Sequence, residues 1–298
     1  MTNTAIILIA LGGPRSLDEV GPFMSVFMGR PAPPPVVSAV VERYKLIGNK
    51  SPLPDLVKAQ AAALEIVLGN DYRVYEGFRY SKPFISESFD RAIREGAMNV
   101  IGLSLSPYET AVTTGTYRNA FDSLQHGSVK KTFIPSWHDN DFFIQAWQER
   151  ISAGLKRFGD EQRNNVAVIF TSHSIPVRYL ASGDPYQKQI EETVKLVVDE
   201  LDLKHWRIAW QSKGARATEP WIEPDVEATL DKTAQEGYKA VLEVPIGFTC
   251  DHLETLYDID IAHRSHATKL GLAFERAESL NTSRMFIQAL ADVVKKNL

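Results

Sequence analysis

The sequence predicts a two-domain α/β protein in which each domain is a four-stranded parallel sheet flanked by helices. Short apolar, β-branched runs alternate with helical segments from end to end, which is typical of parallel sheets wrapped by helices. The length of 298 residues favours two domains over one, and the expected strands form two sets of four. We expect the boundary at the polar stretch 159–165, which gives domains 1–160 and 161–298, with the last helix able to pack back on the first domain.

Strands are expected wherever a short β-branched run is bounded by turn residues. In chain order they are Ala5–Leu11, Arg73–Phe78, Val100–Leu105, Lys131–Ile134, Val166–Thr171, Arg207–Gln211, Ala240–Pro245 and Gly271–Phe274. Helices fill most of the gaps, among them Pro83–Gly96, Phe142–Phe158, Pro185–Leu201, Asp225–Gly237 and Thr282–Lys296. Asp184 and Pro185 form a good helix start, with the aspartate as N-cap and the proline in the first turn. The proline-rich segment 29–36 is expected to be a stiff extended loop.

Composition narrows the class of protein. The net charge is −4 and there is no run of like charges, so nucleic acid is not expected as a partner. The N-terminus lacks the pattern of a signal peptide, and no segment has the apolar length of a membrane span. Cys250 is the single cysteine, which excludes an internal disulfide and a multi-thiolate metal site within one chain. A cytoplasmic location follows as an expectation.

Unusual residues collect where the predicted strands end, which is where open α/β sheets bind ligands. The strand ends carry Leu11-Gly12-Gly13-Pro14, Arg79-Tyr80-Ser81, Ser106-Pro107-Tyr108 and Ser136-Trp137-His138 in the first half, and Ser172-His173-Ser174, Ser212-Lys213-Gly214 and the segment 247–254 in the second. If the two halves face each other, these edges line one cleft that contains aromatic, basic, histidine and carboxylate side chains.

Two of these features have open interpretations. Gly12 and Gly13 are either a turn that lets a ligand approach the backbone or an ordinary strand-to-helix turn. They do not form the G-x-G-x-x-G pattern, so a dinucleotide site has no support. His173 follows a strand directly and could bind a divalent metal or accept a proton. It could equally be a partly buried histidine satisfied by a neighbouring serine.

Glu254 also has two interpretations. Asp251 and Glu254 are spaced like a capping box at a helix start. The other interpretation is functional. Glu254 and Asp258 share a helix face, and His252 is close in the sequence. A row of carboxylates that faces a cleft can pass cations or protons. A row of solvated acids would have the same pattern.

The types of ligand available suggest how a metal would be held. Nitrogen from histidine and oxygen from carboxylate suit divalent ions such as Fe²⁺, Zn²⁺ or Co²⁺. A permanent zinc site usually has three or four protein ligands, and no H-E-x-x-H pattern is present. His263 and His266 are three residues apart, but we expect them to be solvated. A metal held by few ligands can be handed on, which fits a chelatase better than a hydrolase.

An ordered set of segments resembles the ferrochelatase family over essentially the whole chain. The segments are Leu11-Gly12-Gly13-Pro14, Arg43-Tyr44 through Ser51-Pro52-Leu53, Gly77-Phe78-Arg79-Tyr80, Thr113-Thr114-Gly115, Ser172-His173-Ser174-Ile175-Pro176, Gly183-Asp184-Pro185-Tyr186, Trp210-Gln211-Ser212, Pro220-Trp221 with Pro224-Asp225-Val226, and Gly247-Phe248 through Asp251-His252-Leu253-Glu254-Thr255-Leu256-Tyr257-Asp258. Each segment alone is weak evidence. The ordered set, with the H-S-x-P and D-H-x-E-x-L-Y-D patterns intact, is specific.

The resemblance implies an enzyme of haem biosynthesis with two Rossmann-like domains and a porphyrin cleft between them. It implies that His173 and Glu254 form the inner pair that handles metal and protons, and that Asp258 continues an acidic path. Fe²⁺ would then be a substrate, with no permanently bound cofactor. The chain lacks a cysteine-bearing C-terminal extension, so no iron–sulfur cluster is expected.

The sequence departs from the family pattern at several positions. Ala262 stands where the family often has another acid, which puts the outer ion path in doubt. Phe78 replaces a common methionine, a change relevant to how the porphyrin sits, and Tyr108 stands where some members have His or Gln. The usual Gly-Gly-x-Ser-Pro reads as Gly48-Asn49-Lys50-Ser51-Pro52.

Porphyrin-binding candidates follow from the chemistry of the ring and its carboxylates. Aromatic and apolar edges hold a flat π-system, and Arg or Lys pairs with propionates. The candidates are Leu11, Gly12, Phe27, Arg30, Arg43, Lys45, Ser51, Phe78, Tyr80, Tyr108, Thr114 and Trp221. For the cationic ones, solvated surface charge is an equally good interpretation. Phe23, Phe27, Val36, Val37 and Val40 are either an apolar lip that contacts a membrane or the core faces of two helices.

Two other functions remain as alternatives, and the porphyrin itself is open. One is a chelatase for cobalt or another metal of the sirohydrochlorin type. The other is a non-catalytic porphyrin- or haem-binding protein on the same fold. Protoporphyrin IX and coproporphyrin III both fit the pattern, and the short loop at Gly29-Arg30-Pro31 favours the coproporphyrin type.

Overall fold

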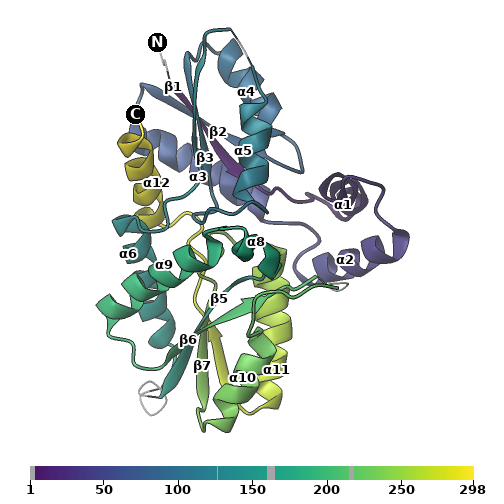
Figure 1. Cartoon of the computed structure of the whole chain (residues 1–298), viewed down its shortest axis with the longest axis vertical. Coiled ribbons are helices and arrows are strands. Elements are labelled where there is room, and N and C mark those ends of the chain that lie inside the picture. Colours follow the sequence, from purple (N-terminus) through teal and green to yellow (C-terminus); the bar gives the residue numbers. More distant parts are fainter. Residues whose placement is uncertain (1–3, 126, 160–164, 215–217) are drawn as a thin grey trace. The chain divides into compact units, whose positions relative to one another are not determined.

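The computed structural model describes residues 4–125, 127–159, 165–214 and 218–298, and it divides the chain into two compact units. Unit 1 comprises residues 1–137 together with 281–298, and unit 2 comprises residues 138–280. Each unit contains one four-stranded parallel sheet (Figure 1). The strand order is β2-β1-β3-β4 in unit 1 and β6-β5-β7-β8 in unit 2, so the two units share one topology.

All eight strands expected from the sequence are present, with ends shifted by two residues or fewer. They are β1 (Thr4–Ala10), β2 (Tyr72–Phe78), β3 (Asn99–Ser104), β4 (Lys130–Ile134), β5 (Val166–His173), β6 (Trp206–Gln211), β7 (Ala240–Val244) and β8 (Ala273–Arg276). Strand β1 is buried along almost its whole length because helices cover both faces of the sheet. The mixed α/β fold with two parallel sheets is therefore confirmed.

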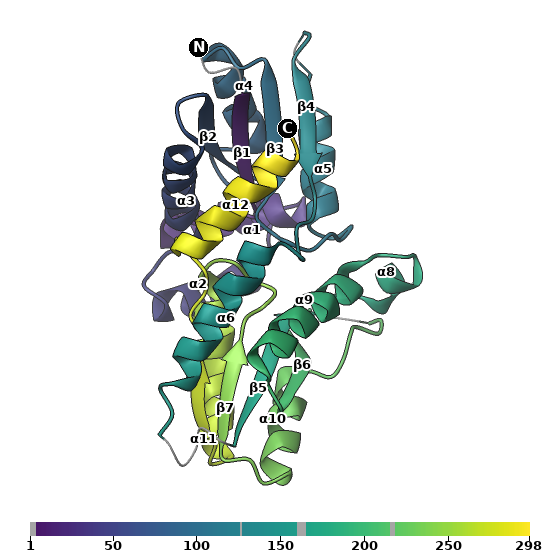
Figure 2. The same cartoon turned by 90° about the vertical axis from the view of Figure 1, so that its left-hand side faces the viewer.

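Helices flank the sheet of unit 1 on both faces (Figures 1 and 2). One face packs on α4 (Ile85–Arg94) and α5 (Thr114–Asp122), and the other on α3 (Leu53–Leu68). Alternate residues of β1 point to opposite faces, so Ala5, Ile7 and Ile9 join Phe89 and Phe121 in one apolar core. The final helix, α12 (Arg284–Lys296), packs on α3 and belongs to this unit.

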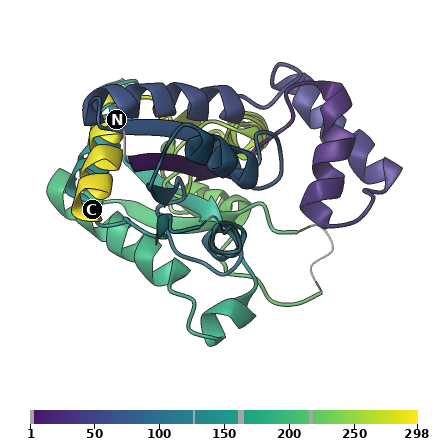
Figure 3. The same cartoon turned by 90° about the horizontal axis from the view of Figure 1, so that it is seen from above.

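The first helices of the chain stand apart from the sheet layers of unit 1 (Figure 3). They are the short 3₁₀ turn η1 (Leu17–Glu19), α1 (Val20–Met28) and α2 (Pro34–Leu46). Pro34 and Pro35 form the first turn of α2, so only part of the segment 29–36 is the extended loop expected from the sequence. A proline is tolerated there because the first turn of a helix does not use its backbone N–H groups.

Unit 2 has helices on both faces of its sheet as well. One face packs on α6 (Asp141–Leu155), which in turn contacts α9 (Tyr186–Leu201). The other face carries α10 (Val226–Gln235), the π-helix η2 (Glu254–His263) and α11 (Arg264–Lys269). The short α8 (Val177–Ala181) follows β5.

The division between the units lies earlier in the chain than the sequence suggested. Helix α6 packs on β7 and α9, so it belongs to unit 2, whereas the sequence predicts that it belongs to the first domain. The polar stretch chosen as the boundary falls largely on residues 160–164, which lie outside the described residues. The polarity of a stretch predicts that it is a surface loop, but it does not predict which of the two sheets the preceding helix, α6, packs against.

Candidate active site

The sheet topology of unit 2 places two loops beside each other. Strands β5 and β7 are neighbours, but the chain leaves β5 toward β6 and leaves β7 toward β8. Such a point, where the connections diverge, is where parallel sheets commonly bind ligands beyond their carboxyl ends. His173 is the last residue of β5, and the segment after β7 leads into Glu254 at the start of η2.

His173 and Glu254 meet at this point. The Nε2 atom of His173 lies 3.6 Å from Oε1 of Glu254, and the two side chains are 36% and 27% exposed. The Nδ1 atom of His173 is 2.5 Å from the carbonyl oxygen of Ser174. Because a carbonyl only accepts, Nδ1 donates this hydrogen bond, and the other ring nitrogen, Nε2, faces Glu254.

His252 contacts the same carboxylate from the other side. Its Nδ1 donates to the carbonyl of Cys250 at 3.0 Å, and its Nε2 lies 3.8 Å from Oε2 of Glu254. Burial alone would lower the pKa of His252, but the Glu254 carboxylate and the Cys250 carbonyl outweigh burial and raise this pKa above its ordinary value. Glu254 therefore lies between two imidazoles whose Nε2 atoms both face it.

The backbone of His173 is fixed by a buried tyrosine. The hydroxyl of Tyr186 donates to the carbonyl oxygen of His173 at 2.9 Å, and it accepts from Ser172 Oγ at 2.7 Å. Gly247 packs against the same place, because a Cβ on this residue would lie 2.0 Å from Ser172 Oγ and 2.8 Å from its Cα. Only glycine permits the segment after β7 to pass so close to the end of β5.

Asp258 lies one helical turn beyond Glu254 and is held from a third strand. Ser212, which follows β6 with a positive φ of 60°, donates from Oγ to Oδ2 of Asp258 at 2.7 Å. Trp221 comes near from the loop before α10, with its ring centroid 6.4 Å from that of His173. Unit 2 thus brings together every site residue that the sequence predicted within it.

Helix η2 has π geometry rather than the α geometry assumed from the sequence. Its buried face is formed by Thr255, Ile259 and His263, and continues with Ala267 in α11, at a constant spacing of four. A steady spacing of four places these residues on one face of the helix. Such helices are rare and occur frequently at functional sites.

Comparison with known proteins places the chain in a family. Residues 3–298 match the sequence model of the Ferrochelatase family. The chain belongs to the ferrochelatase family. It is 38% identical to the ferrochelatases of Citrifermentans bemidjiense and Herpetosiphon aurantiacus, covering 99% and 98% of this chain and 98% of each relative. It is 32% identical to a protein named coproporphyrin III ferrochelatase from Oceanobacillus iheyensis, covering 98% of this chain and 96% of the relative.

Solved structures support the fold of this family member. SirB from Bacillus subtilis with Fe³⁺ superposes with a TM-score of 0.62 at 11% identity, covering 99% of this chain and 95% of that one. The sirohydrochlorin chelatase SirB of subspecies spizizenii in complex with cobalt gives a TM-score of 0.59 at 9% identity, covering 99% and 94%. At these identities the likeness shows the fold alone. The family and the enzyme class expected from the sequence, a lyase that inserts iron into a porphyrin in haem biosynthesis, are confirmed.

The predicted porphyrin-binding residues of this ferrochelatase other than Trp221 lie in unit 1. Gly12, Ser51, Phe78, Tyr108 and Thr114 are buried, Leu11 and Tyr80 are half-buried, and Phe27, Arg30, Arg43 and Lys45 are exposed. Tyr80 packs edge-on against Phe27 with ring centroids 5.0 Å apart, and Arg79 lies over its ring at 4.9 Å. Gly12 has φ of 94°, and a Cβ there would lie 2.3 Å from Ser81 Oγ, so its own packing already requires glycine.

The residues of the expected apolar lip, Phe23, Phe27, Val36, Val37 and Val40, are not fully buried in the structure. Helix α1 buries Val20 alone and α2 buries Tyr44 alone. Phe27 is 48% exposed, and Phe23, Val36, Val37 and Val40 are half-buried. The interpretation of these residues as the core faces of two helices is therefore wrong for Phe27. Among the described residues, no helix is long and apolar enough to cross a membrane.

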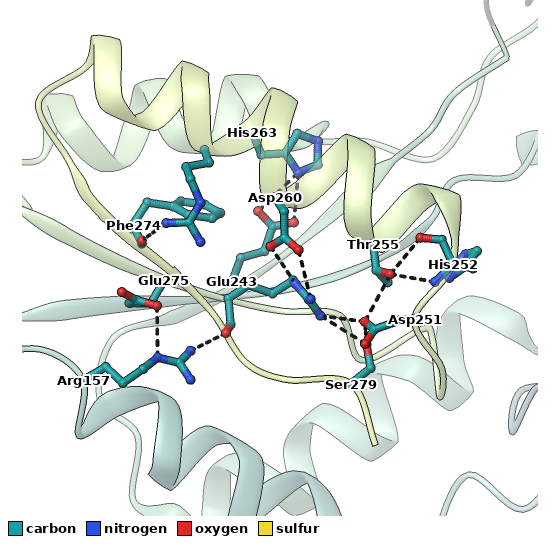
Figure 4. A network of polar contacts seen from close by, with 12 residues as sticks. Arg157, Glu243, Asp251, His252, Thr255, Asp260, His263, Phe274, Glu275 and Ser279 are labelled. Atoms are coloured by element: carbon teal, nitrogen blue, oxygen red, sulfur yellow. Dashed lines mark hydrogen bonds and ion pairs between the residues drawn. The ribbon is translucent and has the colours of Figure 1, made fainter. Parts of the chain in front are cut away.

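Two expectations about histidines need correction. His263 is buried, with Nδ1 3.0 Å from Oε1 of the fully buried Glu243 on β7, so it is not solvated (Figure 4). His266 is partly exposed and contacts Oδ1 of Asp231 at 2.8 Å. Spacing on a helix identifies a face, but it does not show which face the sheet covers. Within the part of the chain that the structure describes, no group of three or more His, Cys, Asp and Glu residues is arranged to hold a metal ion.

Proposed function

We propose that His173 and Glu254 perform the metal- and proton-handling steps of iron insertion in this enzyme. The reaction joins Fe²⁺ to the four pyrrole nitrogens and releases two protons from the ring. The observation that supports these roles is the pair itself: an imidazole nitrogen lies 3.6 Å from a carboxylate oxygen at the carboxyl edge of a parallel sheet.

In this proposal His173 accepts a proton from the ring through Nε2. Its Nδ1–H is held by the Ser174 carbonyl, which fixes both the tautomer and the orientation of the imidazole. The Glu254 carboxylate stabilises the imidazolium that forms, because an opposite charge within a few ångströms favours the charged form. The same oxygen and nitrogen atoms suit Fe²⁺, so the pair can also contact the incoming ion.

His252 and Asp258 have supporting roles in this proposal. His252 has a raised pKa and lies against Oε2 of Glu254, so it can supply positive charge that balances the carboxylate. Asp258 passes protons or ions along η2, and Ser212 orients its carboxylate. Trp221, close to His173, contributes an apolar face for the porphyrin.

Absorbance spectroscopy with purified protein tests the activity and the porphyrin together. Anaerobic incubation with Fe²⁺ and either coproporphyrin III or protoporphyrin IX should convert the free-base spectrum to that of the iron porphyrin. We expect turnover with at least one of the two, and the ratio of kcat/KM values names the natural substrate. Cobalt with sirohydrochlorin serves as the comparison reaction. Binding of both porphyrins without iron insertion would contradict the enzyme and favour a porphyrin-binding protein.

A further inference from the structure

Arg276 ends strand β8 and is linked to η2 at two places. Its guanidinium makes a bidentate contact with Asp260 inside the helix, with Nε 2.8 Å from Oδ1 and Nη2 3.0 Å from Oδ2. Its Nη1 lies 3.1 Å from Oδ1 of Asp251, three residues before Glu254, and 3.2 Å from Ser279 Oγ. The side chain is 11% exposed, so these contacts lie largely out of water.

The other end of η2 is held by the neighbouring strand. Glu243 of β7 stands opposite Arg276 in the strand register, and it contacts His263 at the last position of the helix. Side chains of register partners point to the same face of the sheet, so β7 and β8 both present charged groups to η2. The segment from Asp251 to His263 is therefore attached to the sheet before, within and at the end of the π-helix.

A π-helix requires this kind of support. Its i→i+5 pattern is rare compared with the α-helix, and a released segment would favour α geometry. The two helices differ in their turn per residue, so this change would rotate Glu254 relative to His263 and Asp260. Glu254 would then move away from Nε2 of His173, because only the position of η2 keeps the two side chains close together.

We infer that Arg276 is a positioning residue for iron insertion, because its bridge between Asp251 and Asp260 holds the first turns of η2 where Glu254 faces His173. This inference rests on the role proposed for Glu254. Lysine cannot replace the bridge, because a planar guanidinium offers five donors in a fixed fork whereas an ammonium group is a single point of charge. The Arg276→Lys variant therefore keeps the charge and removes the geometry.

A double-mutant cycle tests the inference. Arg276→Lys is measured in the wild-type background and in a Glu254→Gln background, with kcat and KM for iron and porphyrin in each. Loss of a residue that orients a metal ligand typically lowers activity by about 10–100-fold, and we expect a loss of this size in kcat in the wild-type background. In the Glu254→Gln background the same change should alter the rate by no more than about twofold, because independent sites add and coupled sites do not.

Arg264→Lys is the matched control. Arg264 is also partly buried beside β8, where it donates to the carbonyl of Phe274 at 2.7 Å, but it lies after η2 and contacts neither Asp251 nor Asp260 in the described structure. We expect its effect on rate to be small and equal in both backgrounds. Hydrogen exchange gives a second readout: amides 254–263 should exchange faster in Arg276→Lys than in Arg264→Lys.

The outcomes separate this inference from the proposed function. If Glu254→Gln alone keeps most of the wild-type rate, the role proposed for Glu254 fails. If Glu254→Gln is severe but Arg276→Lys is as active as Arg264→Lys, only the positioning inference fails. Equal losses from Arg276→Lys in both backgrounds overturn it as well. If Arg276→Lys does not fold, Asp260→Asn weakens the same contact from the helix side and should give the same coupling to Glu254.

Discussion

Glu254 presents one carboxylate oxygen 3.6 Å from Nε2 of His173 and the other 3.8 Å from Nε2 of His252. Both imidazoles use their Nδ1 atoms for backbone carbonyls, so each directs its Nε2 atom toward the acid. A glutamate that served only in a capping box would turn its carboxylate back to the amide of Asp251, three residues earlier. The Glu254 carboxylate instead lies against the two histidines.

Glu254→Gln should abolish most iron insertion while leaving the fold intact. The amide keeps the size of the side chain but removes the negative charge that attracts Fe²⁺ and favours a protonated neighbour. Loss of a cap would cost about 0.5–2 kcal/mol of stability, so the melting temperature should change by a few degrees at most. Steady-state kinetics and thermal unfolding of the same preparation check both statements. A variant that keeps most of its rate, or whose defect follows entirely from unfolding, contradicts the assignment.

His173→Ala should abolish metal insertion while porphyrin binding persists. The substitution removes the nitrogen that accepts the proton, but Tyr186 donates to the backbone carbonyl of residue 173, which alanine retains. Porphyrin binding is followed by fluorescence titration and insertion by absorbance. His266→Ala is the control, because His266 contacts Asp231 away from Glu254, and it should keep the wild-type rate. Near-normal turnover of folded His173→Ala would remove this residue from the mechanism.

Asp258→Asn should be milder than Glu254→Gln. Ser212 Oγ can still donate to the amide oxygen of asparagine at this position, so the side chain keeps its place while losing its charge. Ala262 already interrupts the acidic row beyond it, so a further neutral position changes the path less. We expect a reduced kcat with KM for porphyrin unchanged. A loss as deep as that of Glu254→Gln would place Asp258 among the groups that touch iron.

The sequence predicted the strands and the inner pair for a physical reason. Parallel strands buried on both faces are continuous β-branched runs, which are easy to recognise, and His173 ends β5 whereas Glu254 lies in the segment that follows β7. Once β5 and β7 are neighbours, residues that follow them must lie close together. The resemblance to ferrochelatases added the pairing that strand positions alone left open.

Other features depend on contacts that no local pattern contains. Helix η2 contacts Arg276 on β8 and Glu243 on β7, which follow and precede it in the chain, and its π geometry means that an i, i+4 argument for Glu254 and Asp258 assumed the wrong helix. His252 was recognised only as a neighbour of Glu254, although the D-H-x-E pattern contained it. The place of α6 in unit 2 follows from its packing on β7 and α9.

Liposome flotation tests the apolar lip formed by Phe23, Phe27, Val36, Val37 and Val40. Phe27 is 48% exposed on α1, where it could enter the interfacial region of a bilayer. We expect wild type to co-float with liposomes and Phe27→Ser to float less. Ile66→Ser is the control, because Ile66 on α3 is even more exposed, at 81%, but lies outside the lip. Absence of wild-type binding, or equal losses in both variants, would exclude membrane contact through this lip.

The buried Glu243–His263 pair should make stability depend on pH. Burial alone would lower the pKa of His263, but the carboxylate of Glu243, with smaller contributions from Glu227 and Asp258, outweighs burial and raises this pKa above its ordinary value. The folded protein therefore binds a proton that the unfolded chain releases at lower pH. The stabilisation is complete below the unfolded pKa of about 6.5, and it is lost as pH rises through the higher pKa of the folded state.

The double variant Glu243→Leu/His263→Phe isolates this effect, because titrating groups that do not interact with the pair behave alike in both proteins and cancel in the difference. Replacing a buried pair with apolar groups of similar size can be neutral or stabilising, whereas removing one partner costs about 3–5 kcal/mol. The test is therefore how the stability difference between the two proteins changes with pH, and not which of the two proteins is more stable. The free energy of unfolding of wild type minus that of the double variant, from urea denaturation, should fall as pH rises above the unfolded pKa of about 6.5. His263→Leu alone should be the least stable of the three, since it leaves the Glu243 carboxylate buried without its imidazole. A difference that stays flat or rises over this range would show that the pair is not ionised in the folded protein.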